Sequence, residues 1–388
     1  MPERPTVRHS RAALTVRVAR RRGRAASFVA GWVPMSPKVP IRPTLAAVPD
    51  YVPGARPPVG RRAYKLSSNE SPFPPLPGVL AAVADAAADL NRYPDMIAAG
   101  LLDALARYHD IEPDQVVAGN GSVAVLGHVL SAFAGPGDEV IYPWRSFEAY
   151  PILVALSGAT PVPVALGAEG RIDMVGLAKA VTAKTRVVMV CSPNNPTGPA
   201  VRADELTAFL ATVPSNVLVV VDEAYIQYVT DPCAATYEQV AKEHANVISL
   251  RTFSKAYGLA GLRVGYAMGR ARLMSAVRRA ATPFGVNAAA QLAATVSLGL
   301  EDAMVERAER VVSARDALAA TLRGQGWNVP DAQGNFVWLP AGADSIPFAQ
   351  DAEAAGVLVR PFDGDGVRVS VGEPEALAAF VDVAATWA

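Results

Sequence analysis

Short apolar runs alternate with amphipathic stretches over most of the chain. The alanine-rich residues 78–90 and residues 97–108 have the spacing of helices that bury one face. Beyond them, brief β-branched runs are separated by helical segments, a pattern typical of a mostly parallel sheet covered on both faces. The predicted strands, each largely buried, are residues 116–118, 139–142, 160–164, 186–191, 217–222, 247–250 and 265–268. We therefore expect an α/β fold.

The C-terminal part of the chain predicts a smaller α+β unit. A long helical stretch at residues 303–322 precedes apolar runs at 329, 335–339, 357–359 and 367–371. Proline is frequent in residues 35–68, which forbids long helices and indicates an extended arm. The predicted division is an extension (1–34), an arm that packs with the small domain (35–68), a large domain (69–286) and a small domain (287–388).

Composition places the chain among globular proteins. Of its 388 residues, 51% are hydrophobic and 19% charged, so a large core can be buried. The net charge is zero, but residues 1–34 hold eight arginines and one acid, a net of +7, which leaves −7 on the remainder. This mildly acidic body predicts no nucleic-acid partner. Two cysteines suit a reducing cytoplasm, and no apolar run reaches the roughly 18–20 residues that span a bilayer.

The first 34 residues allow several interpretations. They are a disordered tail, or they are upstream sequence translated before a true start at Met35. An export signal around Arg20, Arg21 and Arg22 is disfavoured because the apolar stretch after it is short and interrupted. A basic arm for nucleic acid is disfavoured because no aromatic side chains are interleaved.

The richest polar segment, residues 251–263, follows a predicted strand. Lys255 has the hydroxyls of Thr252 and Ser254 beside it, and Arg263 comes eight residues later. Hydroxyls and an arginine make a fixed anion site, and a lysine beside it could form a Schiff base with a carbonyl. A phosphorylated aldehyde needs that combination.

Three further motifs also follow predicted strands. Asp222 ends a β-branched run, where an isolated carboxylate would be costly; it either caps the next element or keeps a pyridinium nitrogen protonated. Asn195, in a turn stiffened by prolines on both sides, could hydrogen-bond a ring substituent. The glycine-rich residues 119–122 offer backbone N–H groups and a helix N-terminus to an anion.

Together these motifs, in this order, resemble the fold-type I pyridoxal-phosphate aminotransferases, and within them the histidinol-phosphate aminotransferase-like subfamily. The resemblance runs from about residue 51 to residue 372. It implies pyridoxal 5'-phosphate as cofactor, bound by the large domain, and no metal.

By this resemblance Lys255 carries the Schiff base and moves the substrate proton, and Asp222 pairs with the pyridine nitrogen. Asn195 and Tyr225 hydrogen-bond the phenolic oxygen, and Phe147 stacks on the ring. The implied phosphate contacts are Ser122, Thr252, Ser254, Arg263, and the backbone of Gly121 and Val123.

The resemblance also implies substrate contacts and a homodimer. Tyr93 would reach the phosphate in the neighbouring subunit, so that the two active sites are shared. Arg368 would clamp the substrate carboxylate, for which a bidentate guanidinium is suited. Tyr51, Asn69 and Arg360, with Asn195, would surround the rest of the substrate.

The substrate has two main candidates. Residues 144–151, 282–287 and 360–368 look like the aromatic amino-acid aminotransferase branch. We therefore expect reversible ping-pong transamination of phenylalanine or tyrosine with 2-oxoglutarate, giving the aromatic 2-oxo acid and glutamate. The alternative is histidinol phosphate, whose phosphate Arg360, Arg368 and Tyr51 could hold. A decarboxylase of the threonine-phosphate type shares these motifs, whereas a ligand-sensing regulator would need a DNA-binding domain that residues 1–50 are too short to form.

Overall fold

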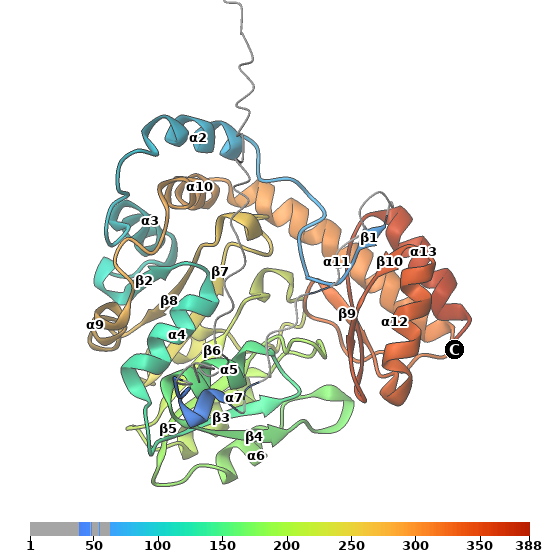
Figure 1. Cartoon of the computed structure of the whole chain (residues 1–388), viewed down its shortest axis with the longest axis horizontal. Helices are drawn as coiled ribbons and strands as arrows, with labels where there is room; N and C mark the ends of the chain where they lie inside the picture. Colours follow the sequence, from blue (N-terminus) through green and yellow to red (C-terminus); the bar gives the residue numbers. More distant parts are fainter. Residues whose placement is uncertain (1–38, 47, 49–53, 55–62) are drawn as a thin grey trace, which may run out of the picture. The chain divides into compact units, whose positions relative to one another are not determined.

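A computed structural model describes residues 39–46, 48, 54 and 63–388 of the chain (Figure 1). Its largest sheet has seven strands in the order β2-β8-β7-β6-β5-β3-β4. Neighbouring strands are parallel except at β8, which runs antiparallel to β2 and β7. The strands are β2 (Val116–Gly119), β3 (Glu139–Trp144), β4 (Thr160–Ala165), β5 (Thr185–Cys191), β6 (Leu218–Asp222), β7 (Val247–Thr252) and β8 (Gly265–Gly269). The expected α/β class with a mostly parallel sheet is confirmed.

Alternate residues of the central strands face two different cores. Val219 and Val221 of β6 lie in one apolar cluster, whereas Leu218 and Val220 lie in the other. Burial on both faces explains why these strands are continuous apolar runs. The first core is covered by α2 (Val79–Ala86), α3 (Ala99–His109), α6 (Met174–Lys179), α7 (Ala203–Thr212), α8 (Tyr237–Val240) and α10 (Ala288–Leu298), and the second by α4 (Ser122–Phe133), α5 (Ala149–Ser157) and α9 (Ala271–Ala280).

Strand β4 differs from the sequence-based expectation of burial. Four of its six residues are exposed, because it lies at the edge of the sheet and pairs with β3 alone. Pro161 and Pro163 suit that position, since proline cannot donate a hydrogen bond to a further strand. An apolar run interrupted by prolines therefore predicts an edge strand better than a central one.

A second sheet forms near the C-terminus. It has the order β11-β12-β9, and all neighbours are antiparallel. A two-stranded parallel ladder joins β1 to β10, so a segment just before residue 66 packs with C-terminal residues. The C-terminal elements are α11 (Glu301–Gly324), β9 (Phe336–Leu339), α12 (Ser345–Ala354), β10 (Val357–Leu358), β11 (Arg360–Phe362), β12 (Gly366–Ser370) and α13 (Pro374–Ala385), and the early ones are α1 (Pro43–Ala46) and β1 (Tyr64–Lys65).

The long helix α11 connects the two cores (Figure 1). Its residues Met304 and Val311 lie in the core beside the large sheet, whereas Leu318 and Leu322 lie in the C-terminal core. Helix α10 packs against α2 and α3. The change of core thus occurs within α11, about 25 residues after the boundary expected at residue 287, because α10 buries its small residues against the large-sheet helices.

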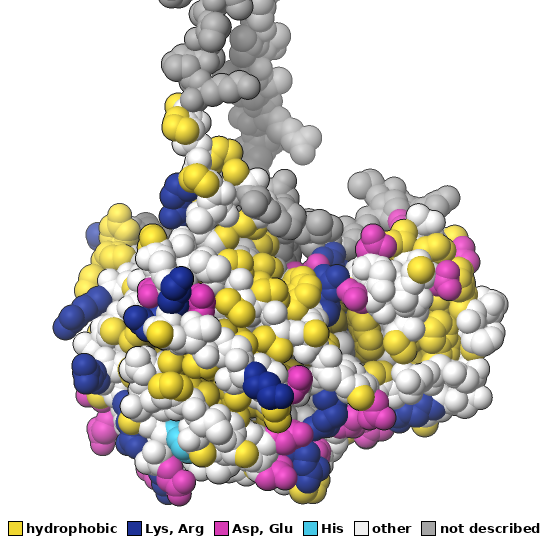
Figure 2. Space-filling view, turned by 90° about the horizontal axis from the view of Figure 1, so that it is seen from below, with side chains coloured by type: hydrophobic (Ala, Val, Ile, Leu, Met, Phe, Trp, Pro, Cys, Tyr) yellow, Lys and Arg dark blue, Asp and Glu magenta, His cyan; other side chains and the backbone are white. Residues whose placement is uncertain are grey.

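Within the part of the chain that the structure describes, no helix is both long and apolar enough to cross a membrane. On the face drawn in Figure 2, basic and acidic side chains lie interspersed over the surface.

Candidate active site

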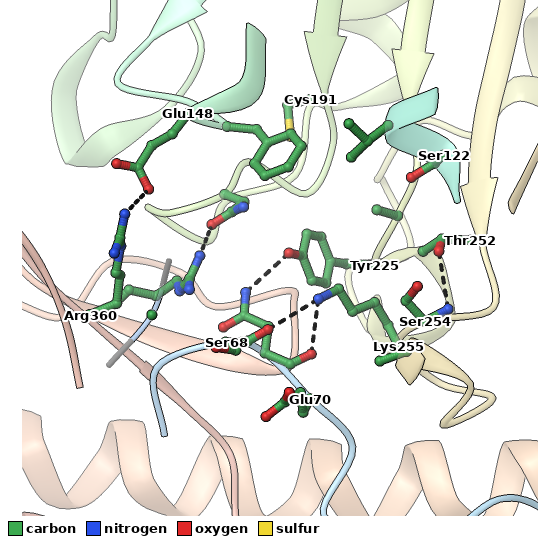
Figure 3. Close-up of a pocket in the computed structure, with 18 of the residues that line it drawn as sticks. Ser68, Glu70, Ser122, Glu148, Cys191, Tyr225, Thr252, Ser254, Lys255 and Arg360 are labelled. Carbon is green, nitrogen blue, oxygen red and sulfur yellow. Dashed lines mark hydrogen bonds and ion pairs between the residues drawn. The ribbon is translucent and has the colours of Figure 1, made fainter. Parts of the chain in front are cut away.

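A pocket of about 330 Å³ opens at the carboxyl ends of the parallel strands. Cys191 at the end of β5 is in register with Asp222 at the end of β6, so the segments that follow these strands meet at one edge. Residues of β11 and β12 form the opposite wall (Figure 3). The predicted site residues that line the pocket are Asn69, Ser122, Val123, Phe147, Asn195, Asp222, Tyr225, Thr252, Ser254, Lys255, Arg263, Arg360 and Arg368.

Of the predicted residues that the structure describes, Tyr93 does not line this pocket and Gly121 lies beside it. Tyr51 lies outside the described residues. Tyr93 is 85% exposed and its ring lies 4.9 Å from that of Phe284. Gly121 has φ of +84°, and a Cβ there would come within 2.6 Å of the Arg263 guanidinium, so glycine leaves the room that this guanidinium occupies.

Lys255 follows β7 in a tight turn. Its amine donates to the backbone oxygens of Ser68 and Asn69, at 3.3 and 3.1 Å (Figure 3). Burial away from water, and after it the positive charge of Arg368, lower the pKa of Lys255 to about 7. A substantial fraction of this amine is therefore neutral at physiological pH, as a nucleophile or a proton acceptor requires.

Asp222 also lines the pocket and is buried. Burial raises its pKa to about 6, and the hydrogen bond from the Tyr150 hydroxyl, 2.8 Å long, opposes that rise. The backbone N–H of Ala224 donates to its other oxygen. A buried carboxylate held in this way favours a cationic ring nitrogen as its partner.

An anion cradle lies between the ends of β2 and β7. The Ser254 N–H donates to the Thr252 hydroxyl at 3.0 Å, and the Arg263 guanidinium lies 3.5 Å from the Ser254 hydroxyl. Ser122 begins α4, so its helix N-terminus faces the same space. Three hydroxyls, a guanidinium and backbone N–H groups are the donors that a phosphate needs.

The substrate side of the pocket is held by a second set of contacts. Arg368 donates to the Asn195 side-chain oxygen at 2.5 Å and to the Ser67 backbone oxygen at 2.8 Å. The oxygen of Asn195 is thus engaged, and a bond from Asn195 to a ligand would come from its NH2 group.

Asn69, which was expected beside the substrate, lines the pocket, and its side chain also bonds two other residues of the protein. Its amide donates to the Tyr225 hydroxyl at 3.0 Å and its side-chain oxygen accepts from Ser370 at 2.8 Å. With φ at +50°, it turns the chain so that its backbone oxygen meets Lys255. Asn69 therefore positions two predicted catalytic groups as well as lining the pocket.

Sequence reasoning assigned no role to three residues of this site. Tyr150 bonds Asp222, Glu148 forms an ion pair with Arg360, and Phe362 lines the pocket next to both arginines. All three stand in segments that carried the resemblance, but their partners are far away in sequence. A pattern along the chain holds no signal for such pairs.

Comparison with known proteins agrees with this geometry. The family model described as aminotransferase class I and II matches residues 62–383, so the chain belongs to that family. It is a transaminase, and pyridoxal 5'-phosphate is its cofactor. The residues present fit that group, because the pocket joins an anion cradle, a buried carboxylate and an amine of lowered pKa.

Individual relatives are similar over nearly their whole length. An aromatic amino acid aminotransferase of Thermobifida fusca is 53% identical over 89% of this chain and 97% of its own. One from Streptomyces avermitilis is 50% identical over 90% and 97%. The crystal structure of histidinol-phosphate aminotransferase from Sinorhizobium meliloti in complex with pyridoxal-5'-phosphate has a TM-score of 0.78 and 28% identity, covering 85% of this chain and 93% of that one.

Proposed function

We propose that this enzyme transfers the amino group of aromatic L-amino acids, phenylalanine or tyrosine, to 2-oxoglutarate. The observation that carries the proposal is the substrate end of the pocket, where the guanidinium carbon of Arg368 lies 5.8 Å from the centre of the Phe362 ring. An apolar wall next to a guanidinium suits an amino acid with an uncharged aromatic side chain. Relatives at 50% identity or more that bear the name aromatic amino acid aminotransferase support the same substrate class.

The proposed roles divide the pocket into three parts. Arg368 and Asn195 hold the substrate carboxylate. Asp222 keeps a proton on the ring nitrogen of the cofactor, with Tyr225 and Asn195 at its phenolic oxygen and Phe147 on its face. The phosphate is held by Gly121, Ser122, Val123, Thr252, Ser254 and Arg263.

Pyridoxal 5'-phosphate, when bound, supplies the carbonyl that accepts an amino group and a ring that accepts electrons. Lys255 acts at the substrate. Its neutral amine takes the proton from the substrate α-carbon and returns it on the other side of the transferred nitrogen. The carboxylate contact with Arg368 fixes which bond at the α-carbon lies next to Lys255. The same contacts serve the 2-oxo acid in the second half of a ping-pong cycle.

Histidinol phosphate is a second candidate substrate. Arg360 and Arg368 line the pocket together, and a phosphate monoester would engage both. The similarity to the Sinorhizobium meliloti histidinol-phosphate aminotransferase supports this candidate, at the lower identity of 28%.

Separate half-reactions distinguish the two candidates. The cofactor-loaded enzyme is mixed with excess phenylalanine or histidinol phosphate, without an acceptor, and the cofactor absorbance is followed. Fast conversion with phenylalanine and slow conversion with histidinol phosphate supports aromatic transamination. The reverse order would make the second candidate the function.

We also propose that the enzyme is a cytoplasmic homodimer. Four apolar side chains are exposed on two segments: Tyr93, Met96, Ile97 and Phe284. The Phe284 N–H donates to the Met96 backbone oxygen and so joins the segment around Phe284 to residues 93–97. A partner subunit would cover them and receive Tyr93 at its cofactor phosphate. The free thiols of Cys191 and Cys233 suit a reducing compartment.

A further inference from the structure

An ion pair crosses the substrate end of the pocket. The Arg360 guanidinium lies 2.6 Å from a carboxylate oxygen of Glu148 (Figure 3). Glu148 directly precedes α5 and Arg360 opens β11, so the pair joins the large sheet's side of the pocket to the C-terminal sheet. The Arg360 side chain is 9% exposed and that of Glu148 29%. Both residues line the pocket.

Arg360 stands next to the arginine proposed for the substrate carboxylate. Arg360 and Arg368 are register partners on β11 and β12. Their guanidinium carbons lie 5.7 and 5.8 Å from the centre of the Phe362 ring. An anion bound by Arg368 is therefore within reach of Arg360.

The charge at this end decides which anion is favoured. A carboxylate carries one negative charge, whereas a phosphate monoester carries roughly −1.5 to −2 at neutral pH. Two cooperating arginines favour the phosphate. Glu148 changes that balance, because its carboxylate cancels the charge of Arg360 and repels a second anion placed beside it.

We propose that Glu148 is a specificity-determining residue of this aminotransferase. By holding Arg360 in an ion pair, it makes the pocket accept the carboxylate of an amino acid with an uncharged side chain and reject phosphorylated amino alcohols. Glu148 acts through Arg360 and is thus a positioning residue. This inference rests on the proposed aromatic function.

The test measures binding of two unreactive ligands to the cofactor-loaded enzyme by calorimetry. Inorganic phosphate probes the dianion and 3-phenylpropanoate probes the aromatic carboxylate. In Glu148→Gln, we expect phosphate to bind about tenfold or more tightly, the range of a gained charge-assisted bond. Binding of 3-phenylpropanoate should change by much less. The half-reaction rate with histidinol phosphate should likewise rise relative to the rate with phenylalanine.

Two variants show whether the effect runs through Arg360. Glu148→Asp keeps the negative charge and should keep the wild-type ratio of the two dissociation constants. The double variant Glu148→Gln with Arg360→Gln should return to a ratio near that of the wild type. It lacks both the carboxylate of Glu148 and the positive charge of Arg360 that this carboxylate neutralises. Since it replaces the pair by two neutral amides, it also serves as a folding control.

A neighbouring ion pair provides the matched control. Arg145 and Asp365 join the same two sides of the molecule, with the Arg145 Nε 2.6 Å from the carboxylate, and neither lines the pocket. Asp365→Asn should leave the ratio unchanged. An equal shift in Asp365→Asn, or no shift in Glu148→Gln, would overturn the inference while leaving phenylalanine turnover by the wild type intact. Preference of the wild type for histidinol phosphate would overturn the proposed function as well.

Discussion

Lys255 owes its chemistry to its surroundings. The pocket lowers the pKa of its amine from 10.5 to about 7, first by burial and then through the charge of Arg368. A lowered pKa means that the amine loses its proton as the pH rises through about 7, so the reactive neutral form dominates above that pH. Both causes lie outside the turn that carries the lysine.

This shift predicts the pH dependence of cofactor capture. In cofactor-free enzyme, the rate constant for uptake of pyridoxal 5'-phosphate should rise through a midpoint near pH 7 and level off above it. A midpoint close to the ordinary lysine value of 10.5 would contradict the lowered pKa. In Arg368→Gln the midpoint should move to higher pH, because one nearby positive charge is removed. Stopped-flow absorbance at a series of pH values measures both.

Tyr150 is predicted to tune Asp222. Its hydroxyl bonds the carboxylate at 2.8 Å and lowers the pKa of Asp222, against the rise caused by burial. Tyr150→Phe should therefore raise the pKa of Asp222 above about 6, so that the acidic limb of the profile of kcat/KM against pH moves to higher pH. The control is Tyr142→Phe, whose ring packs edge-on against Tyr150 at 6.3 Å and leaves that bond in place. An unchanged acidic limb in Tyr150→Phe would refute the role.

At the level of elements, strand ends build the site. Strands β5, β6 and β7 run parallel, so the turns that carry Asn195, Asp222 and Lys255 reach one edge. The reversed strand β8 lies between β7 and β2 and brings their ends together around the anion cradle. Close approach of these backbones requires glycine at residue 265.

Gly265 gives a prediction about cofactor affinity. A Cβ there would collide with the backbone N–H of Ser122 and come within 2.9 Å of the Arg251 backbone oxygen. Gly265→Ala must displace the start of α4, so affinity for pyridoxal 5'-phosphate should fall about tenfold or more, as expected when one charge-assisted phosphate contact is lost. Fluorescence titration of cofactor-free enzyme measures this loss.

Gly269, on the same strand, provides the control for Gly265. A Cβ at Gly269 would meet side-chain atoms of Ile248 and Met274, away from the cradle. Gly269→Ala should thus reduce stability while largely preserving cofactor affinity. Equal loss of affinity in both variants would mean that the effect is general unfolding.

For the whole molecule, α11 ties the two cores together. Arg315 in this helix is 1% exposed and donates to the backbone oxygens of Tyr228 and Gly334, at 2.8 and 3.3 Å. Its Nη2 also lies 3.2 Å from the Thr230 hydroxyl. One buried guanidinium therefore bonds a loop after β6 and the segment that leads into β9.

Loss of Arg315 should destabilise the fold. In Arg315→Met the buried backbone oxygens lose their donors, which costs about 2–4 kcal/mol of unfolding free energy for two such groups. Arg310→Met removes an exposed arginine of the same helix and should cost well under 1 kcal/mol by the usual size of surface effects. Urea denaturation of both variants compares them, and equal costs would contradict the bridging role.

The proposed dimer predicts complementation between inactive variants. Lys255→Ala homodimers lack the amine, and Tyr93→Ala homodimers would lack the phosphate contact in both sites. A mixed dimer has one site with Lys255 from one subunit and Tyr93 from the other, so mixing and refolding the two variants should restore activity. No recovery, with dimers present by sedimentation, would show that Tyr93 does not act across subunits.

The pattern of residues along the chain determined much of the fold and part of the active site. Apolar runs followed by polar turns predicted the seven strands of the large sheet and pocket residues such as Asn195, Asp222 and Lys255, because burial on both faces and turn chemistry leave local patterns. Those patterns also carried the family resemblance. Phe147, Tyr225 and Arg368 were implied by the family resemblance alone. Strand β11, which bears Arg360, was missed because three residues beginning with an arginine and a proline show no strand period.

Tertiary structure alone decided which side chains meet. Asp222 and Tyr150 are 72 residues apart, and Arg360 and Glu148 are 212 apart. Such contacts arise when separate elements pack on one another, so no spacing along the chain encodes them. Three properties follow from that packing: the neutralised charge of Arg360, the pKa of Lys255 and the edge position of β4. Each depends on what surrounds a residue in space rather than on what precedes it in the sequence.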